Sequence, residues 1–277
     1  YIWCFQIAGW FKFHSNVAIL TMSAGLFFVF FTYGNFLANG FTIWNSRFGK
    51  VDFSYKLDNN HTLNFGLMSQ FYNINSGTYE PLHESSLVKW DQLQKDKALE
   101  SAIYIGDQWE ITPKLSVNAG IRYSMFNLLG PRTYYTYQDG MLPSSTTVVD
   151  SVSVGGGKVV KTYQGPEFRL SARYAFNDDF SVKAGFNTMR QYIHKVSNTT
   201  IMSPTDTWKL SDTNIKPQNG WQLAAGAYYN TPGQVLELSV EGYYKKLNDY
   251  LDYRSSARLI MNHHLETDVI NTEGYAY

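Results

Sequence analysis

The sequence is built from long runs in which apolar residues occupy every second position, each followed by a tight polar turn and a second such run. Residues 51–57 alternate in this way, turn through 58–60 and resume the alternation over 63–67. Successive side chains of a strand point to opposite faces, so this pattern predicts strands with one apolar face. Turns this short permit only hairpins, and the strands are therefore predicted to be antiparallel neighbours in sequence order.

The same unit recurs three more times, with tight turns at residues 112–114, 177–179 and 231–234. The connections between units are long and polar, at residues 73–97, 128–161, 195–219 and 248–266. Short turns at one end of the strands and long loops at the other are typical of a transmembrane β-barrel with periplasmic turns and extracellular loops. We predict an all-β fold, a partial transmembrane antiparallel β-barrel of about ten strands; a soluble barrel or sandwich is the alternative.

The composition fits such a barrel. Among 277 residues there are 21 Tyr, 18 Phe and 7 Trp, whereas charged residues make up only 17%. So much aromatic surface must be buried or must face lipid. The 23 basic and 23 acidic side chains cancel, and without a basic face no nucleic acid partner is expected. The single cysteine, Cys4, excludes an intrachain disulfide and a multi-cysteine zinc site.

Charged residues of the expected strands fall on the face opposite the apolar stripe. A wide membrane barrel has a watery lumen, so we expect the charged face to line the lumen and the apolar stripe to meet lipid. The residues predicted to face the lumen are Arg122, Arg173, Lys183 and Glu241, and those predicted to face lipid are Val117, Ala119, Ile121 and Tyr123. Aromatic residues near strand ends, such as Trp109 and Phe126, are expected at the membrane interface.

One uncharged stretch, residues 17–36, has the length of a transmembrane helix. The alternative is a lipid-facing strand after a turn near His14, followed by a loop at residues 35–40 and a strand from Phe41. A helix inserted between barrel strands would leave strand edges unpaired in lipid, so strands are the preferred interpretation.

Residues with catalytic or metal-binding potential are few. His263 and His264 stand near Glu266 and Asp268, but a solvated loop accounts for such a run without a metal. Residues 155–157 are three glycines without the Lys-Ser/Thr of a phosphate-binding loop. A barrel lipase lacks support because the sequence has no Gly-x-Ser-x-Gly elbow. We expect no metal, no cofactor and no enzyme activity.

The long loops combine aromatic rings with Asn, Ser, Thr and Asp. Rings stack on sugar faces or pack on peptides while the polar groups hydrogen-bond, so this mixture favours a neutral, amphipathic ligand. The loops show no Arg and Lys cluster suited to an anionic ligand. The proposed ligand contacts are Trp208, Tyr134, Tyr135 and Asp206; the alternative is that these rings lie at the level of the lipid headgroups.

The region 187–218 holds the most distinctive motifs: RQYIH at 190–194, SNTT at 197–200, Pro204, Asp206 and Trp208, and IKPQ at 215–218. It closely resembles the C-terminal half of the barrel of Bacteroidetes outer-membrane TonB-dependent receptors. The strand at 237–253 and the loop motifs YEPL at 79–82 and ESS at 84–86 are similar to the same family. The resemblance covers residues 41–277 and is weak before Phe41.

This resemblance implies a barrel of about 22 strands, plugged by an N-terminal domain and energised by an inner-membrane TonB complex. It implies uptake of a nutrient, an oligosaccharide, peptide or chelate, across the outer membrane. Implied partners are outer-membrane lipid, the TonB complex through an N-terminal region and, in some members, a surface lipoprotein. Residues 1–277 are then one partial barrel domain without plug or TonB box, part of a longer chain. The alternative function is a receptor-like barrel that serves as a structural scaffold in an outer-membrane complex.

Overall fold

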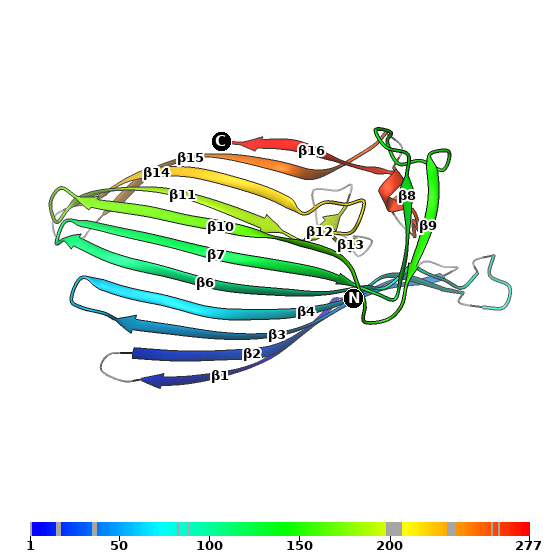
Figure 1. The fold of residues 1–277 in the computed structure, drawn as a ribbon, viewed down its shortest axis with the longest axis horizontal. Coiled ribbons are helices and arrows are strands. Elements are labelled where there is room, and N and C mark those ends of the chain that lie inside the picture. Colours follow the sequence, from blue (N-terminus) through cyan, green and yellow to red (C-terminus); the bar gives the residue numbers. More distant parts are fainter. Residues whose placement is uncertain are drawn as a thin grey trace.

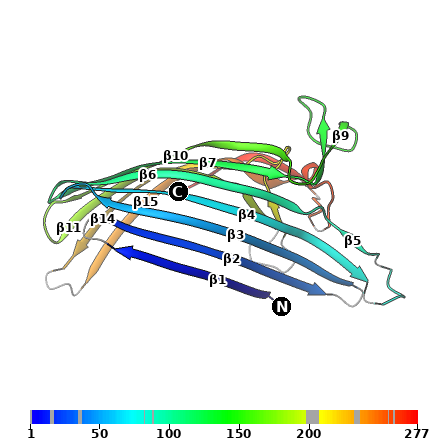
Figure 2. The ribbon, with the colours of Figure 1, turned by 60° about the horizontal axis from the view of Figure 1, so that its bottom comes forward.

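The computed structural model is an all-β chain dominated by one large curved antiparallel sheet (Figures 1 and 2). It describes residues 2–14, 18–34, 38–81, 83–87, 89–197, 207–231, 236–255, 257–259 and 261–277. The long strands are β1 (Ile2–His14), β2 (Ala18–Gly34), β3 (Ala38–Lys56), β4 (His61–Pro81), β6 (Asp96–Thr112), β7 (Leu115–Leu129), β10 (Val159–Ala175), β11 (Phe180–Gln191), β14 (Gln218–Asn230), β15 (Glu237–Tyr253) and β16 (Val269–Ala276). The short elements are β5 (Asp91–Gln92), β8 (Arg132–Tyr137), β9 (Val148–Val154), β12 (Ile193–Val196), β13 (Thr207–Leu210) and the 3₁₀ helix η1 (Leu265–Thr267).

The long strands lie side by side in sequence order, β1-β2-β3-β4-β6-β7-β10-β11-β14-β15-β16, and each pairs antiparallel with the next. The predicted first hairpin is confirmed, since β3 and β4 pair with Val51 opposite Leu67. The stretch 17–36 contains strand β2, which pairs with β1 and β3, so the strand interpretation is correct there. In the part of the chain that the structure describes, no helix is long and apolar enough to cross a membrane.

Side chains close the tight turns that set this order. Asp58 Oδ1 accepts hydrogen bonds from the backbone N–H groups of Asn60 and His61, both at 2.7 Å. Asn177 Oδ1 accepts hydrogen bonds from the N–H groups of the second and third residues after it, at 3.1 and 2.7 Å. Asn and Asp favour turns because their side chains can satisfy the backbone in this way. Figure 1 shows the tight turns at one end of the sheet and the long connections at the other.

The long connections contain more structure than the sequence indicated. Strand β4 continues to Pro81 and β6 begins at Asp96, so much of the loop expected at 73–97 is strand. The loop expected at 128–161 contains the β8–β9 hairpin, and the one at 195–219 contains β13, which pairs with β12. Apolar alternation fails as a signal in the extensions of β4 and β6 because polar residues such as Ser76, Asp96 and Glu100 take buried positions there.

The register divides the sheet into two chemically different faces. Arg122 lies opposite Glu167 and Arg173 opposite Lys183, while Gly226 lies between Lys183 and Glu241 on neighbouring strands. Paired residues share a face, so the four residues predicted to face the lumen all lie on the same side, called here the inner face. The opposite face, called here the outer face, exposes large apolar side chains, including Ile103, Ile121, Tyr123, Phe168, Leu170, Leu223 and Val240.

The β12–β13 hairpin packs against the inner face near the loop end of the sheet, on the concave side seen in Figure 2. It contributes to a buried cluster with β4, β6 and β7, whose members are Tyr72, Ile74, Ala98, Phe126, Leu128, Tyr192 and Leu210. Phe126 and Tyr192 stack with ring centroids 4.8 Å apart. The expectation that Phe126 lies at the membrane interface is therefore wrong: its ring is fully buried by the hairpin.

The close approach of strands β3, β4 and β6 gives a first prediction. A Cβ added at Gly66 would overlap the carbonyl oxygen of Val51 and the Tyr104 hydroxyl, which contacts Asp52. In the full-length protein refolded into lipid vesicles, Gly66→Ala should lower the free energy of unfolding by about 1–3 kcal/mol, measured in urea. Gly49→Ala is the control, since its Cβ would meet nothing within 4 Å. Equal stability of the two variants would contradict the packing.

Candidate functional site

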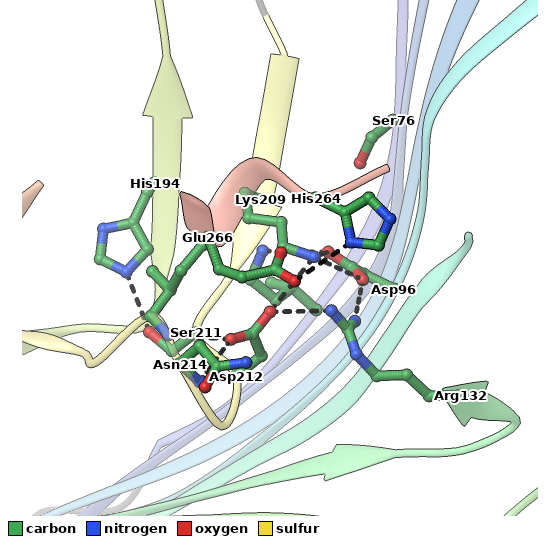
Figure 3. Close-up of polar contacts among 12 residues, drawn as sticks. Ser76, Asp96, Arg132, His194, Lys209, Ser211, Asp212, Asn214, His264 and Glu266 are labelled. Carbon is green, nitrogen blue, oxygen red and sulfur yellow. Dashed lines mark hydrogen bonds and ion pairs between the residues drawn. The ribbon is translucent and has the colours of Figure 1, made fainter. Parts of the chain in front are cut away.

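Four charged side chains from separate segments meet at the loop end of the inner face (Figure 3). Arg132 at the start of β8 contacts Asp96 at the start of β6, and its Nη2 lies 2.8 Å from Asp212 Oδ2. Lys209 of β13 lies between the same carboxylates, with Nζ 3.3 Å from each. Asp96, Asp212 and Arg132 are buried and Lys209 nearly so. Two positive and two negative groups thus form a closed, neutral cluster.

The backbone around Asp212 holds this cluster in place. Its Oδ1 accepts hydrogen bonds at 2.9 Å from the N–H groups of Asn214 and Ile215. Burial alone would raise the pKa of Asp212, but Lys209, Arg132 and these two N–H groups outweigh it and lower the pKa overall. The carboxylate is therefore charged at neutral pH, as the two cations require.

The cluster holds the β8–β9 and β12–β13 hairpins against strand β6 of the main sheet. Arg132 links β8 to β6, and Lys209 links β13 to β6. A buried ion pair contributes little against an apolar replacement, yet removing one partner leaves a buried charge uncompensated. The arrangement therefore specifies where the β8–β9 and β12–β13 hairpins lie more than it adds net stability.

Beside the cluster lies a pocket of about 150 Å³. Tyr134 and Tyr135 of β8 line it, together with Asn214, Asn262 and the segment that carries His264 and Glu266. The Tyr135 ring lies 4.9 Å from the His264 ring, centroid to centroid. Aromatic rings, amides and charged side chains thus surround a small opening at the loop end.

Neighbouring contacts fix the far wall of this pocket. The Tyr137 hydroxyl donates a hydrogen bond to Glu266 at 2.9 Å. Burial, and then the negative charge of Glu266, raise the pKa of Tyr137, so the phenol stays protonated. His263 on the same segment lies 3.0 Å from Asp91 of β5. Three segments far apart in sequence are thereby held around the opening.

The predicted ligand contacts separate in the structure. Tyr134 and Tyr135 line the pocket. Trp208 instead packs against the buried cluster under the hairpin, and its carbonyl oxygen accepts a hydrogen bond from Ser76 at 2.7 Å. Asp206 lies outside the described residues. Ligand contact by any of them stays a prediction. Among the described residues no three His, Cys, Asp or Glu side chains could hold a metal ion.

Sequence reasoning missed both charged groups of the inner face. Asp96, Arg132, Lys209 and Asp212 are scattered over more than a hundred positions, and only the pairing of the strands brings them together. Further along the inner face, Arg122 Nη2 lies 3.1 Å from Glu100 and its Nε 3.7 Å from Glu167. Alternation placed Arg122 on this face but gave no sign of its two carboxylate partners.

The buried His194 of β12 gives the second prediction. Its Nε2 lies 2.9 Å from Ser211 Oγ, and burial lowers its pKa from 6.5 to about 4, against the opposing effect of Asp212. Between pH 6.5 and 4, His194 is therefore protonated in the unfolded chain but neutral in the folded hairpin. The stability of the hairpin falls as the pH falls through this window. Opening of β12–β13 should become easier by about 2 kcal/mol at pH 5 relative to pH 7.

Hydrogen exchange of residues 193–196 and 207–210, corrected for intrinsic rates, measures this change. His194→Gln should remove it, because glutamine still reaches Ser211 but does not titrate. His83→Gln, at an exposed loop histidine, should leave it in place. A wild-type hairpin with the same protection at pH 5 and pH 7 would contradict the role given to His194.

Comparison with known proteins identifies the family to which this fold belongs. A family model for the TonB dependent receptor-like β-barrel matches residues 3–272. The chain is similar in structure to the ferric yersiniabactin uptake receptor FyuA from Yersinia pestis, with TM-score 0.54 and 13% identity over 90% of this chain and 36% of that one. It is also similar to the ferric-catecholate import receptor Fiu from E. coli K12, with TM-score 0.57 and 12% identity over 98% and 43%. It is similar as well to the copper transporter OprC, with TM-score 0.57 and 12% identity over 91% of this chain and 41% of that one. No curated protein matches the chain.

At such low identity these structures show the fold alone, and the chain spans only 36 to 43% of their length. The family model, in contrast, covers almost all of the chain. The resemblance to TonB-dependent receptors is confirmed in this form, while an origin in Bacteroidetes and a count of 22 strands stay predictions. The family consists of transport receptors rather than enzymes. The chain therefore belongs to the TonB-dependent receptor β-barrel family, and it is a strand-built part of a protein of the bacterial outer membrane.

Proposed function

We propose that the intact protein takes up a nutrient across the outer membrane with energy from a TonB complex. The pocket beside Tyr134 and Tyr135 is the observation that carries this proposal, since it places an opening lined by aromatic rings and amides at the loop end of a receptor barrel. In this proposal the loop end is extracellular and the tight turns are periplasmic. A plug and a TonB-contacting region lie outside residues 1–277.

The two faces of the sheet support this orientation. The exposed apolar side chains of the outer face are suited to lipid, because a charged residue at the middle of a bilayer costs about 2–4 kcal/mol. The inner face, with Arg122, Arg173, Lys183 and Glu241, lines the lumen in this proposal. Strands β1 and β16 each pair on one side only among the described residues. Further strands of the protein would satisfy these edges in lipid.

The chemistry of the pocket favours a neutral, amphipathic ligand such as an oligosaccharide or a peptide. The four buried charges beside it cancel one another, so this cluster presents no net charge to an approaching ligand. Two tyrosine rings offer stacking surfaces, and the amides of Asn214 and Asn262 offer hydrogen bonds. FyuA and Fiu are named for the import of ferric chelates and OprC for copper, and a chelate is the second candidate for this chain.

The third prediction tests the pocket. Purified full-length protein, screened against neutral oligosaccharides and short peptides, should bind at least one of them, and Tyr135→Ala should weaken that binding at least tenfold, about 1.4 kcal/mol. Tyr134→Ala should act in the same direction. Leu142→Ala, at an exposed position of the β8–β9 hairpin outside the pocket, is the control. Binding that depends on a ferric chelate alone, or that survives both tyrosine substitutions, would refute the neutral-ligand site.

The fourth prediction separates a transporter from a structural scaffold. In cells that lack the TonB complex, the ligand should still bind at the surface but should no longer accumulate inside. A barrel that serves only as a scaffold, with or without a surface lipoprotein partner, would show the same accumulation with and without TonB. The measurement is uptake of the radiolabelled ligand by cells with the receptor, compared with cells that carry an empty vector.

A further inference from the structure

The outer face changes its chemistry along the strands, from the tight turns toward the loop end. In the part nearer the turns it exposes large apolar side chains, such as Leu67 of β4 and Ile103 of β6, which lie opposite each other. Toward the loop end the same face continues through a pair of serines on these strands to Arg47 of β3 and Lys97 of β6. The outer face thus passes from apolar to cationic within a few residues.

Burial on the opposite side places these two cations on the outer face. Ser46 and Ala98, the residues adjacent to them in sequence, are buried on the inner face beside the cluster under the β12–β13 hairpin. Successive side chains of a strand point to opposite faces, so Arg47 and Lys97 point away from the lumen. A segment that fills the interior of the barrel cannot reach them. Their surroundings are the neighbouring strands and whatever lies outside the barrel.

Alternation also separates the opposite charges of β6. Asp96 and Glu100 point inward, where Asp96 contacts Arg132 and Glu100 lies 3.1 Å from Arg122. Lys97 lies between these two acidic residues in sequence but points outward. The inward carboxylates are therefore used by inward cations, and they are separated from Lys97 by the sheet.

The direct neighbours of the two outward cations are neutral. Arg47 lies between Leu26 of β2 and Phe71 of β4. Lys97 lies between an asparagine of β4 and a leucine of β7. Arg47 is exposed and Lys97 partly exposed. Both can therefore meet an anion that approaches from outside the barrel.

Two further cations occupy outer-face positions near the loop end, and each has a partner in the protein. Lys246 of β15 lies 3.0 Å from Glu273 of β16. Arg190 of β11 donates a hydrogen bond to the carbonyl oxygen of Gln164 at 2.8 Å. Among the described residues, in contrast, no carboxylate lies within ion-pair distance of Arg47 or Lys97.

The distance of these cations from the tight turns matches the thickness of a membrane. Arg47 precedes the turn at Asp58 by 11 residues, and Lys97 precedes the turn at Thr112 by 15. With a rise of about 3.3 Å per residue and a strand tilt of about 40°, they lie roughly 28 and 38 Å from the turns along the membrane normal. The apolar band of such a barrel is about 25 Å tall. Both side chains therefore reach the headgroup layer at the loop end.

We propose that Arg47 and Lys97 bind the phosphate groups of an anionic lipid, whose acyl chains pack on the apolar part of the outer face. The inference rests on the proposed function, because it requires the loop end to be extracellular and the outer face to meet lipid. A guanidinium binds phosphate through two parallel hydrogen bonds, and lysine adds a point charge. The two cations are separated by one strand, about 10 Å across the sheet, so a headgroup with more than one phosphate fits best.

The test measures lipid binding to the full-length receptor in a non-ionic detergent by native mass spectrometry. The probes are diphosphorylated lipid A and the same lipid after removal of both phosphates, so that the acyl chains are identical. Wild-type protein should bind the phosphorylated probe at least tenfold more tightly. The double variant Arg47→Gln with Lys97→Gln should reduce this preference to less than threefold, and Arg47→Lys should retain part of it.

Lys246→Gln is the matched control, since it removes an outer-face lysine that already has a carboxylate partner. It should keep the preference within twofold. Equal binding of the two probes by the wild type, or binding of neither, would refute the site. An unchanged preference in the double variant, or an equal loss in Lys246→Gln, would show that net charge rather than these two residues attracts the lipid. Migration of heated and unheated samples on detergent gels verifies that each variant is a folded barrel.

A separate measurement distinguishes failure of this site from failure of the proposed orientation. In a Cys4→Ser background, a membrane-impermeant maleimide should label Leu142→Cys of the β8–β9 hairpin on intact cells, but not Asp178→Cys in a tight turn. Labelling of the second variant alone would invert the barrel and refute the orientation on which both proposals depend. The expected labelling combined with a missing phosphate preference would refute the lipid site alone and leave the transport proposal intact.

Discussion

The pairing of backbone groups between strands is the constraint on which the rest of this structure depends. In the hydrocarbon of a membrane no water is present to pair with an N–H or C=O group, so each strand must lie between two others. Tight turns closed by Asp58 and Asn177 bring each strand back beside the previous one, in sequence order. A slip of one residue would exchange the inner and outer faces, because side chains alternate along a strand. The register therefore decides which side chains meet lipid and which meet one another.

At the loop end of the sheet, buried ion pairs rather than strand pairing determine where the segments lie. Beyond the apolar band, β4 and β6 continue with polar residues at several of their buried positions, and the loops form hairpins of their own. Asp96 belongs to the main sheet, whereas Arg132, Lys209 and Asp212 come from the loops. Three of the four ion pairs therefore join a loop to the sheet or to another loop, and only Lys209–Asp212 lies within one loop. Any displacement of a hairpin would separate buried opposite charges, which is costly in a medium of low dielectric constant. Charge thus fixes the position of the loops as alternation fixes the position of the strands.

The sequence predicted those parts of the fold that follow from local periodicity. The hairpins, their order and the shared face of Arg122, Arg173, Lys183 and Glu241 depend on a period of two and on turn residues, and both can be read from a single chain. Phe126 follows the same alternation and was misplaced, since its burial depends on a hairpin that is about 70 residues away in sequence.

The candidate site depends on such long-range contacts throughout. Lys209 Nζ lies 3.3 Å from Asp96, although the two residues are 113 positions apart in the sequence. No local pattern at either residue indicates the other. Sequence reasoning noted the tyrosines at 134 and 135 because an aromatic cluster is visible in one segment. It concluded that cations were not gathered in the loops, whereas Arg132 and Lys209 do meet, and the two aspartates cancel their charge. Neither the meeting of these two cations nor its neutralisation by the aspartates can be read from any one segment of the sequence.

The paired charges at the loop end decide how the pocket there would act on a ligand. At the loop end the charges are paired and buried, so their fields nearly cancel at a distance and offer no long-range attraction. Recognition there must come from shape, ring stacking and hydrogen bonds, which act only at contact. In the proposed transporter a neutral ligand would thus be selected at the pocket by contact alone, because the paired charges beside it neither attract nor repel a molecule from a distance.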